Sequence, residues 1–194
     1  TDSDSVIHRF ESYYPSHIEK EVGNCQLLCY VKCMIKIKDY CVLDIETTGL
    51  SRFKDDILEI GCIKIRDHKI IDQMSVLINP HKPISPYITS INHITDEMVQ
   101  KEGIELEEAL IRLYDFIEDD CLVGHNLSFD MGFIRQKSSE SLGLSFDHVQ
   151  YDTLMLSRKR IRCENYKLST VCRYYNIQNK TAHRALSDVI ATYQ

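Results

Sequence analysis

The chain has 194 residues, which suits one ordinary domain with at most a short appendage and is enough to bury a core without disulfides. Apolar residues make up 43% and charged residues 27%, the balance of a globular protein, and no apolar run reaches the roughly 18–20 residues that cross a bilayer. The net charge of −6 argues against tight, unaided binding to long duplex DNA, and the acidic N-terminus lacks a signal-peptide pattern, so we expect a cytoplasmic protein without membrane contact.

The cysteines are expected to be reduced and mostly buried. Several of the eight fall in apolar, strand-like runs, where cysteine behaves as a small hydrophobic residue. Cys25, Cys29 and Cys33 are spaced like zinc ligands, but Cys163 and Cys172 do not supply the second ligand pair that a zinc site requires.

The first 39 residues have a different pattern from the rest. Ile18–Ile37 shows a helical period, although Tyr30–Ile37 fits a strand equally well. We therefore expect a helical appendage over residues 1–39 and a main domain over residues 40–194.

From Tyr40 onward the hydrophobic pattern is clearer. Strand patterns occupy Tyr40–Glu46, Ile57–Arg66, Ile70–Ile78, Cys121–Gly124 and Val149–Asp152. Helix patterns occupy Glu105–Glu118, Leu127–Lys137, Thr153–Arg158, Leu168–Tyr175 and the residues from Ala185 onward. The first three strands suit an antiparallel meander, and the later alternation of strands and helices predicts an α/β fold with a mixed sheet.

Two acidic residues share one face of the first strand. Because side chains at i and i+2 point the same way, Asp44 and Glu46 project together. Two adjacent carboxylates on an apolar central strand resist desolvation, and a hard divalent cation would remove that difficulty. The alternative is an edge strand with both acids in water.

Two later segments carry further acidic residues. Asn126 is a plausible N-cap of a helix that places Asp130 one turn in, and His183 lies five residues before Asp188 near the start of another helix. Each segment alone has an ordinary explanation, because acidic residues commonly complement the dipole at a helix start.

Together, these segments resemble the DEDD exonuclease superfamily in its histidine-bearing branch, most closely the proofreading exonucleases of bacterial DNA polymerase III. Asp44–Gly49 matches the family's Asp-x-Glu-Thr-Thr-Gly string, His125–Phe133 matches His-Asn-x-x-Phe-Asp-x-Gly-Phe, and His183–Asp188 matches His-x4-Asp. The resemblance covers residues 40–194, which would be the exonuclease domain. It implies a ribonuclease H-like fold: a five-stranded mixed sheet with the first three strands antiparallel.

The resemblance also implies a two-metal mechanism with Mg²⁺ or Mn²⁺. Asp44 would bridge the two cations. Glu46 and Asp188 would complete the coordination shell of one cation, and Asp130 would contribute to the shell of the other. His183 would act as general base, and 5′-mononucleotides would leave from 3′ ends.

The resemblance assigns several residues to substrate binding. The turn that would hold the terminal nucleotide comprises Thr47, Thr48, Gly49 and Leu50. The alternative is an ordinary strand-ending turn.

Three other residues have a substrate role and a structural alternative. Asn126 would contact substrate or only cap its helix, and His93 would line the site or lie on a surface loop. Phe129 would shape the nucleotide pocket or belong to the core, and the core is favoured.

The expected partner is the single-stranded or frayed 3′ end of DNA, with a DNA polymerase as a candidate associate. The same chemistry would serve an exoribonuclease that trims RNA or short oligonucleotides. A third reading, from another class, is an inactive exonuclease fold used as an interaction module. The loss of a metal-binding carboxylate would support that reading, and none is lost.

Overall fold

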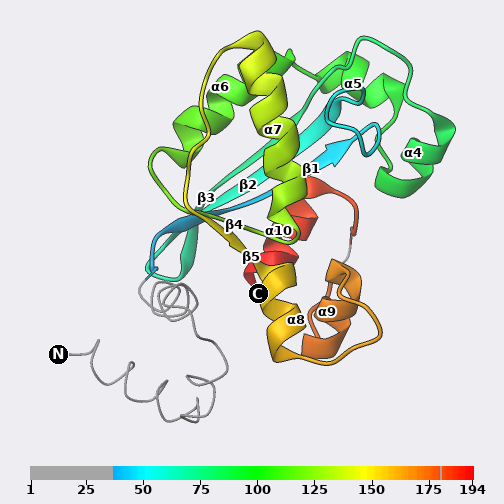
Figure 1. Cartoon of the computed structure of the whole chain (residues 1–194). Helices are drawn as coiled ribbons and strands as arrows, with labels where there is room; N and C mark the ends of the chain where they lie inside the picture. Colours follow the sequence, from blue (N-terminus) through cyan, green and yellow to red (C-terminus); the bar gives the residue numbers. More distant parts are fainter. Residues whose placement is uncertain (1–36, 180) are drawn as a thin grey trace. The chain divides into compact units, whose positions relative to one another are not determined.

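The computed structural model describes residues 37–179 and 181–194 (Figure 1). The expected helical appendage over residues 1–39 lies, except for its last three residues, outside the described residues. The residues from Asp39 to Gln194 form one compact unit.

A five-stranded mixed sheet forms the centre of the fold, in the order β3-β2-β1-β4-β5. Its strands are β1 (Tyr40–Thr47), β2 (Ile57–Arg66), β3 (Lys69–Leu77), β4 (Leu122–Gly124) and β5 (Gln150–Asp152). The first three pair antiparallel, whereas β4 runs parallel to β1 and β5 parallel to β4. The predicted mixed sheet is confirmed. The alternative that placed Asp44 and Glu46 on an edge strand is wrong, because β1 lies between β2 and β4.

Two helices, α6 (Leu106–Ile117) and α7 (Leu127–Ser141), cover one face of this sheet (Figure 1). Alternate residues of β1, including Leu43 and Ile45, join their apolar side chains in one buried core. The intervening residues of β1 therefore point to the opposite face, where α10 (Ala185–Tyr193) packs on β1 and β2.

Four shorter helices complete the described fold: α4 (Pro86–Asn92), α5 (Asp96–Glu102), α8 (Thr153–Arg160) and α9 (Leu168–Tyr175). The periodic pattern did not predict α4, whose start is instead set by Pro86 and by the Ser85 side chain, which accepts a hydrogen bond from the Ile88 N–H. None of the helices in this described part of the chain has the length and apolar character needed to cross a membrane.

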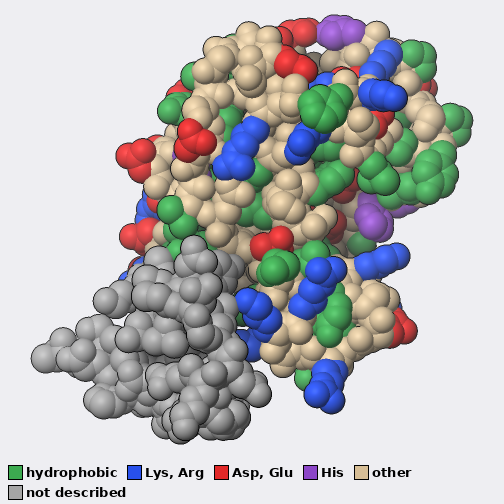
Figure 2. Space-filling model, in the orientation of Figure 1, with side chains coloured by type: hydrophobic (Ala, Val, Ile, Leu, Met, Phe, Trp, Pro, Cys, Tyr) green, Lys and Arg blue, Asp and Glu red, His purple; other side chains and the backbone are tan. Residues whose placement is uncertain are grey.

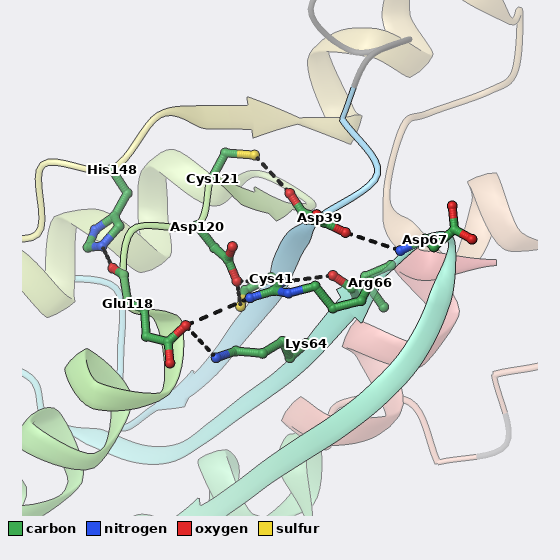
Figure 3. A network of polar contacts seen from close by, with 10 residues as sticks. Asp39, Cys41, Lys64, Arg66, Asp67, Glu118, Asp120, Cys121 and His148 are labelled. Carbon is green, nitrogen blue, oxygen red and sulfur yellow. Dashed lines mark hydrogen bonds and ion pairs between the residues drawn. The ribbon is translucent and has the colours of Figure 1, made fainter. Parts of the chain in front are cut away.

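A polar network fixes the N-terminal end of β1 (Figure 3). Arg66 on β2 forms an ion pair with Asp120 at 2.7 Å, and Lys64 pairs with Glu118 at 3.2 Å. The Cys41 thiol also donates to Asp120. Cys41 and its neighbour Cys62 are buried and free, as the sequence predicts for these positions. The network ties the first two strands to the loop between α6 and β4.

Candidate active site

The two carboxylates of β1 lie on the face covered by α10. Directly opposite Asp44 on β2 stands Gly61, and a Cβ there would lie 2.4 Å from the carbonyl carbon of Ala185. The missing side chain therefore lets the first turn of α10 approach the sheet closely. This approach brings Asp188, one turn into α10, toward Asp44 and Glu46.

Asp130 reaches the same place from the other helix layer. The short strand β4 pairs with β1 only at Cys41 and Val42, so the later residues of β1 face no strand on that side. The Ile45 N–H donates instead to the Asp130 carboxylate, at 3.0 Å. Asp130 is 4% exposed, so it is a buried acid held against β1 and not merely a surface partner of the helix dipole.

The loop before α10 brings His183 into the group. His183 adopts a left-handed backbone conformation, with φ of 65°, and its N–H donates to the Asp188 carboxylate at 3.3 Å. Glu46, His183 and Asp188 each offer a ligand atom, and these three atoms lie within 4.8 Å of one another. The ring is exposed whereas Asp188 is buried, so His183 lies at the solvent side of the cluster.

Burial and mutual repulsion make these acids reluctant to ionise. Burial raises the pKa of Asp44 well above its usual range, and the charges of Asp130 and Asp188 raise it further. Burial also raises the pKa of Glu46 to about 8 and that of Asp130 to about 8. A divalent cation would reverse this effect by favouring the ionised form, and carboxylate oxygens are the ligands that Mg²⁺ and Mn²⁺ prefer. The donor set therefore fits hard divalent cations.

Glu59 is a site residue that sequence reasoning missed. It pairs across the sheet with Glu46 and is 1% exposed. Its carboxylate receives two hydrogen bonds from the Arg184 guanidinium, at 3.0 and 2.8 Å, and one from the Ala185 N–H at 3.0 Å. Glu59 thus caps α10 and fixes the loop that carries His183. The feature of the sequence that could have revealed Glu59 is an acidic residue inside the apolar run of β2.

The structure brings Asn92, and not the predicted His93, to the carboxylates. Asn92 is 1% exposed and its side chain hydrogen-bonds Glu46, which favours the ionised form of that acid. His93 is exposed in a left-handed conformation at the end of α4, so its substrate role stays a prediction. A third missed residue is Asn179, whose amide donates to Asp188.

Asn126 is the N-cap residue of α7, as predicted, but it does not cap the helix through its side chain. Asn126 occupies the N-cap position but is left-handed, with φ of 67°, and its side chain makes no capping hydrogen bond. Its backbone N–H donates to Asp152, which in turn caps α8 through the Leu154 N–H. The Asn126 side chain is exposed, four residues before Asp130, so its substrate role stays a prediction. Phe129 packs against the core, as the structural alternative predicts.

The turn after β1 is braced by its own side chains. The Thr47 hydroxyl donates to the Gly49 carbonyl at 2.6 Å, and the Thr48 hydroxyl accepts from the Asp56 N–H at 2.9 Å. A Cβ at Gly49 would lie 2.5 Å from the Asp55 carboxylate, so this position has no room for a side chain unless Asp55 moves. Leu50 is 87% exposed at the tip, available to contact a bound molecule.

Comparison with known proteins identifies similar sequences and folds. A family model described as Exonuclease (RNase_T) matches residues 41–194. The DNA polymerase III PolC-type of Caldanaerobacter subterraneus is 41% identical over 155 residues, and the one of Bacillus subtilis is 35% identical over 161. These matches cover 79% and 82% of this chain but 11% of each polymerase, so the chain spans about a tenth of these relatives.

Two solved structures share the fold. E. coli exonuclease I in complex with a dT13 oligonucleotide has a TM-score of 0.68 at 18% identity, covering 81% of this chain and 40% of that one. Exonuclease X in complex with 5′ overhanging duplex DNA has a TM-score of 0.63 at 27% identity, covering 79% of this chain and 87% of that one. The ribonuclease H-like, mixed-sheet fold expected from the sequence is thus confirmed.

Proposed function

This chain belongs to the exonuclease family, and on that premise we propose that it is a metal-dependent 3′→5′ exonuclease that releases 5′-mononucleotides. One observation carries the proposal. Four carboxylates from one strand and two helices, Asp44, Glu46, Asp130 and Asp188, gather beside the exposed imidazole of His183. An inactive fold used only for interaction would have no need of such a buried acidic cluster.

The chemistry follows from this donor set. Asp44, Glu46, Asp130 and Asp188 would hold two divalent cations, Mg²⁺ or Mn²⁺, which when bound activate water and stabilise the leaving 3′-oxygen. His183, on the solvent side of the cluster, takes the proton of the attacking water, a task for which an imidazole is the usual group. Asn92 and Asn179 orient Glu46 and Asp188 through hydrogen bonds, and Glu59 holds the loop that carries His183.

We further propose that the substrate is the single-stranded or frayed 3′ end of DNA and that the chain proofreads for a DNA polymerase. The similarity to polymerase III proteins supports this role, as does the fold shared with nucleases solved in complex with an oligonucleotide and with overhanging DNA. The turn formed by Thr47, Thr48, Gly49 and Leu50 would hold the terminal nucleotide, with the exposed Leu50 against its base. A replication role agrees with the expected cytoplasmic location.

The test is degradation of single-stranded DNA and RNA labelled at either end, with Mg²⁺, with Mn²⁺ or with EDTA. We expect stepwise shortening from the 3′ end that requires the cation, faster on DNA than on RNA. Asp44→Ala should abolish it, whereas Asp115→Asn, an exposed change on α6, should have no effect. Activity that resists the chelator, or none on any substrate, would overturn the proposal. Faster degradation of RNA would point instead to the exoribonuclease.

A further inference from the structure

One carboxylate outside the acidic cluster joins three separate segments of the fold. Asp56 is the last residue before β2. Its side chain forms an ion pair with Lys137 of α7, at 3.1 Å, and another with Lys82 in the loop between β3 and α4. None of the three is among the residues that the sequence assigns to metal or substrate, so the site described above leaves this cluster without a role.

The cluster is ionised and partly shielded from water. Burial alone would raise the pKa of Asp56, but hydrogen bonds and charge from Lys82 and Lys137 outweigh it and lower that pKa below its usual value. Figure 2 shows Lys and Arg side chains spread over the surface of α8 and α9, whereas the Lys137 side chain is only 12% exposed. An ion pair in such a position is screened less by solvent and salt than one on the open surface.

The backbone of Asp56 holds the turn after β1 (residues 47–50) at Thr48. The Thr48 N–H donates to the Asp56 carbonyl at 2.8 Å, and the Thr48 hydroxyl accepts from the Asp56 N–H at 2.9 Å. The main chain of Asp56 thus fixes Thr48, while its carboxylate is tied to α7 and to the loop before α4. The turn is thereby connected to both of these segments.

Both segments also carry residues of the acidic site. Asp130 lies on α7 about two turns before Lys137. The loop with Lys82 leads into α4, which ends at Asn92, and the Asn92 side chain hydrogen-bonds Glu46. The ion pairs of Asp56 therefore set where the turn lies relative to the elements that position the carboxylates.

We propose that Asp56 is a positioning residue, which through Lys82 and Lys137 keeps the turn after β1 in the conformation that receives the terminal nucleotide. This role rests on the proposed function and identifies what orders its nucleotide turn; Asp56 itself touches no substrate. Without the ion pairs, the turn occupies the competent conformation for only part of the time, and apparent affinity falls with that fraction. A bound nucleotide restores the ordered turn, so conversion of bound substrate changes little.

Amide hydrogen exchange measures the turn directly, without metal or substrate. Asp56→Asn keeps the size of the side chain and removes its charge. We expect the Thr48 N–H to exchange about tenfold faster than in the wild type, because local opening of the turn costs less free energy. The Leu43 N–H, on the central strand, should exchange at the wild-type rate. Lys137→Met should also speed exchange at Thr48, and Lys137→Arg, which keeps the charge, should do so less.

Kinetics with Mg²⁺ test the consequence for the substrate. Asp56→Asn should raise KM about fivefold and change kcat by less than about twofold. The rise should be equal for a dinucleotide and a twelve-nucleotide single strand, since both place a terminal nucleotide in the turn. Loss of folded protein would instead lower kcat and leave KM unchanged. The double variant Asp56→Asn/Lys137→Met should raise KM no further than Asp56→Asn does, because both changes break the same ion pair.

Glu108→Gln is the matched control, because it breaks a different ion pair, the one with Arg112 on α6. It should leave KM and the exchange of Thr48 at wild-type values. Unchanged exchange or unchanged KM in Asp56→Asn would overturn the positioning role, as would a rise in KM confined to the longer strand. A wild type that hydrolyses no substrate would overturn the exonuclease function, and faster Thr48 exchange in Asp56→Asn would then still support Asp56 as the residue that orders the turn.

Discussion

Replacing Asp130 by Asn is expected to abolish nuclease activity while stabilising the metal-free protein at alkaline pH. Asn has the same size and keeps an oxygen that can accept the 3.0 Å hydrogen bond from the Ile45 N–H. It removes the buried charge that repels Asp44 and Glu46, and with it a ligand for the cation. The substitution therefore separates the catalytic need for this carboxylate from its cost to folding.

The magnitude follows from the shift in pKa. Burial raises the Asp130 pKa from 3.8 to about 8. Because the folded pKa lies above the unfolded value, the stabilising contribution of the protonated acid is complete below pH 3.8 and is lost as pH rises through about 8. The full shift corresponds to about 5–6 kcal/mol at about 1.4 kcal/mol per unit, and relaxation and water entry reduce it, so we expect a gain of about 1–3 kcal/mol at alkaline pH.

Urea unfolding in EDTA at about pH 5 and about pH 8.5 measures this effect. The free energy of unfolding of Asp130→Asn should exceed that of the wild type by more at about pH 8.5 than at about pH 5. Asp115→Asn, which changes an exposed acid on α6, should show no such trend. Adding Mg²⁺ should raise the stability of the wild type more than that of Asp130→Asn, because only the wild type has all four carboxylates.

Equal stability of wild type and Asp130→Asn at about pH 8.5 in EDTA, with parallel pH dependence, would contradict the expected gain. Asp130 would then be ionised at little cost in the folded protein, and the acidic cluster would need no cation to offset its charge.

Three further substitutions test the site. His183→Ala should lower kcat by about 10²-fold or more with metal-induced stabilisation largely intact, and full activity would remove His183 from the role of base. Glu59→Gln should cost about 2 kcal/mol of stability by weakening the buried pair with Arg184, and should lower kcat by loosening the His183 loop; unchanged stability and kcat would contradict this. Gly61→Ala should destabilise by about 1–3 kcal/mol, because its Cβ would meet the Ala185 backbone. Thermal unfolding that matches the wild type would show that α10 shifts freely.

Most strands and helices of the fold were predictable, because the hydrophobic periods of strands and helices are local. The α9 prediction, Leu168–Tyr175, agrees at both ends with the structure, and α10 begins at Ala185 as expected. The α7 prediction ended at Lys137, four residues early, because the last turn has little apolar periodicity and is held instead by the Ser138 hydroxyl, which donates to the Leu144 carbonyl. Local pattern thus defined the elements better than their ends.

Local sequence was enough to place Asp44 and Glu46 on one face of a strand, since side chains alternate along any strand. It also indicated that two later segments carry acids of the same kind, through their family resemblance. What it left undecided was which polar side chains meet those acids. Only the tertiary structure brings Glu59 to Arg184, 125 residues away, and turns Asn92 rather than His93 toward Glu46.

The physical reason is that burial of a polar group depends on what packs over it. Gly61 admits α10, the short β4 leaves the Ile45 N–H for Asp130, and neither consequence is visible in the residues next to those acids. The sequence indicated which residues could bind metal, and the packing of helices on both sides of β1 brings those residues together.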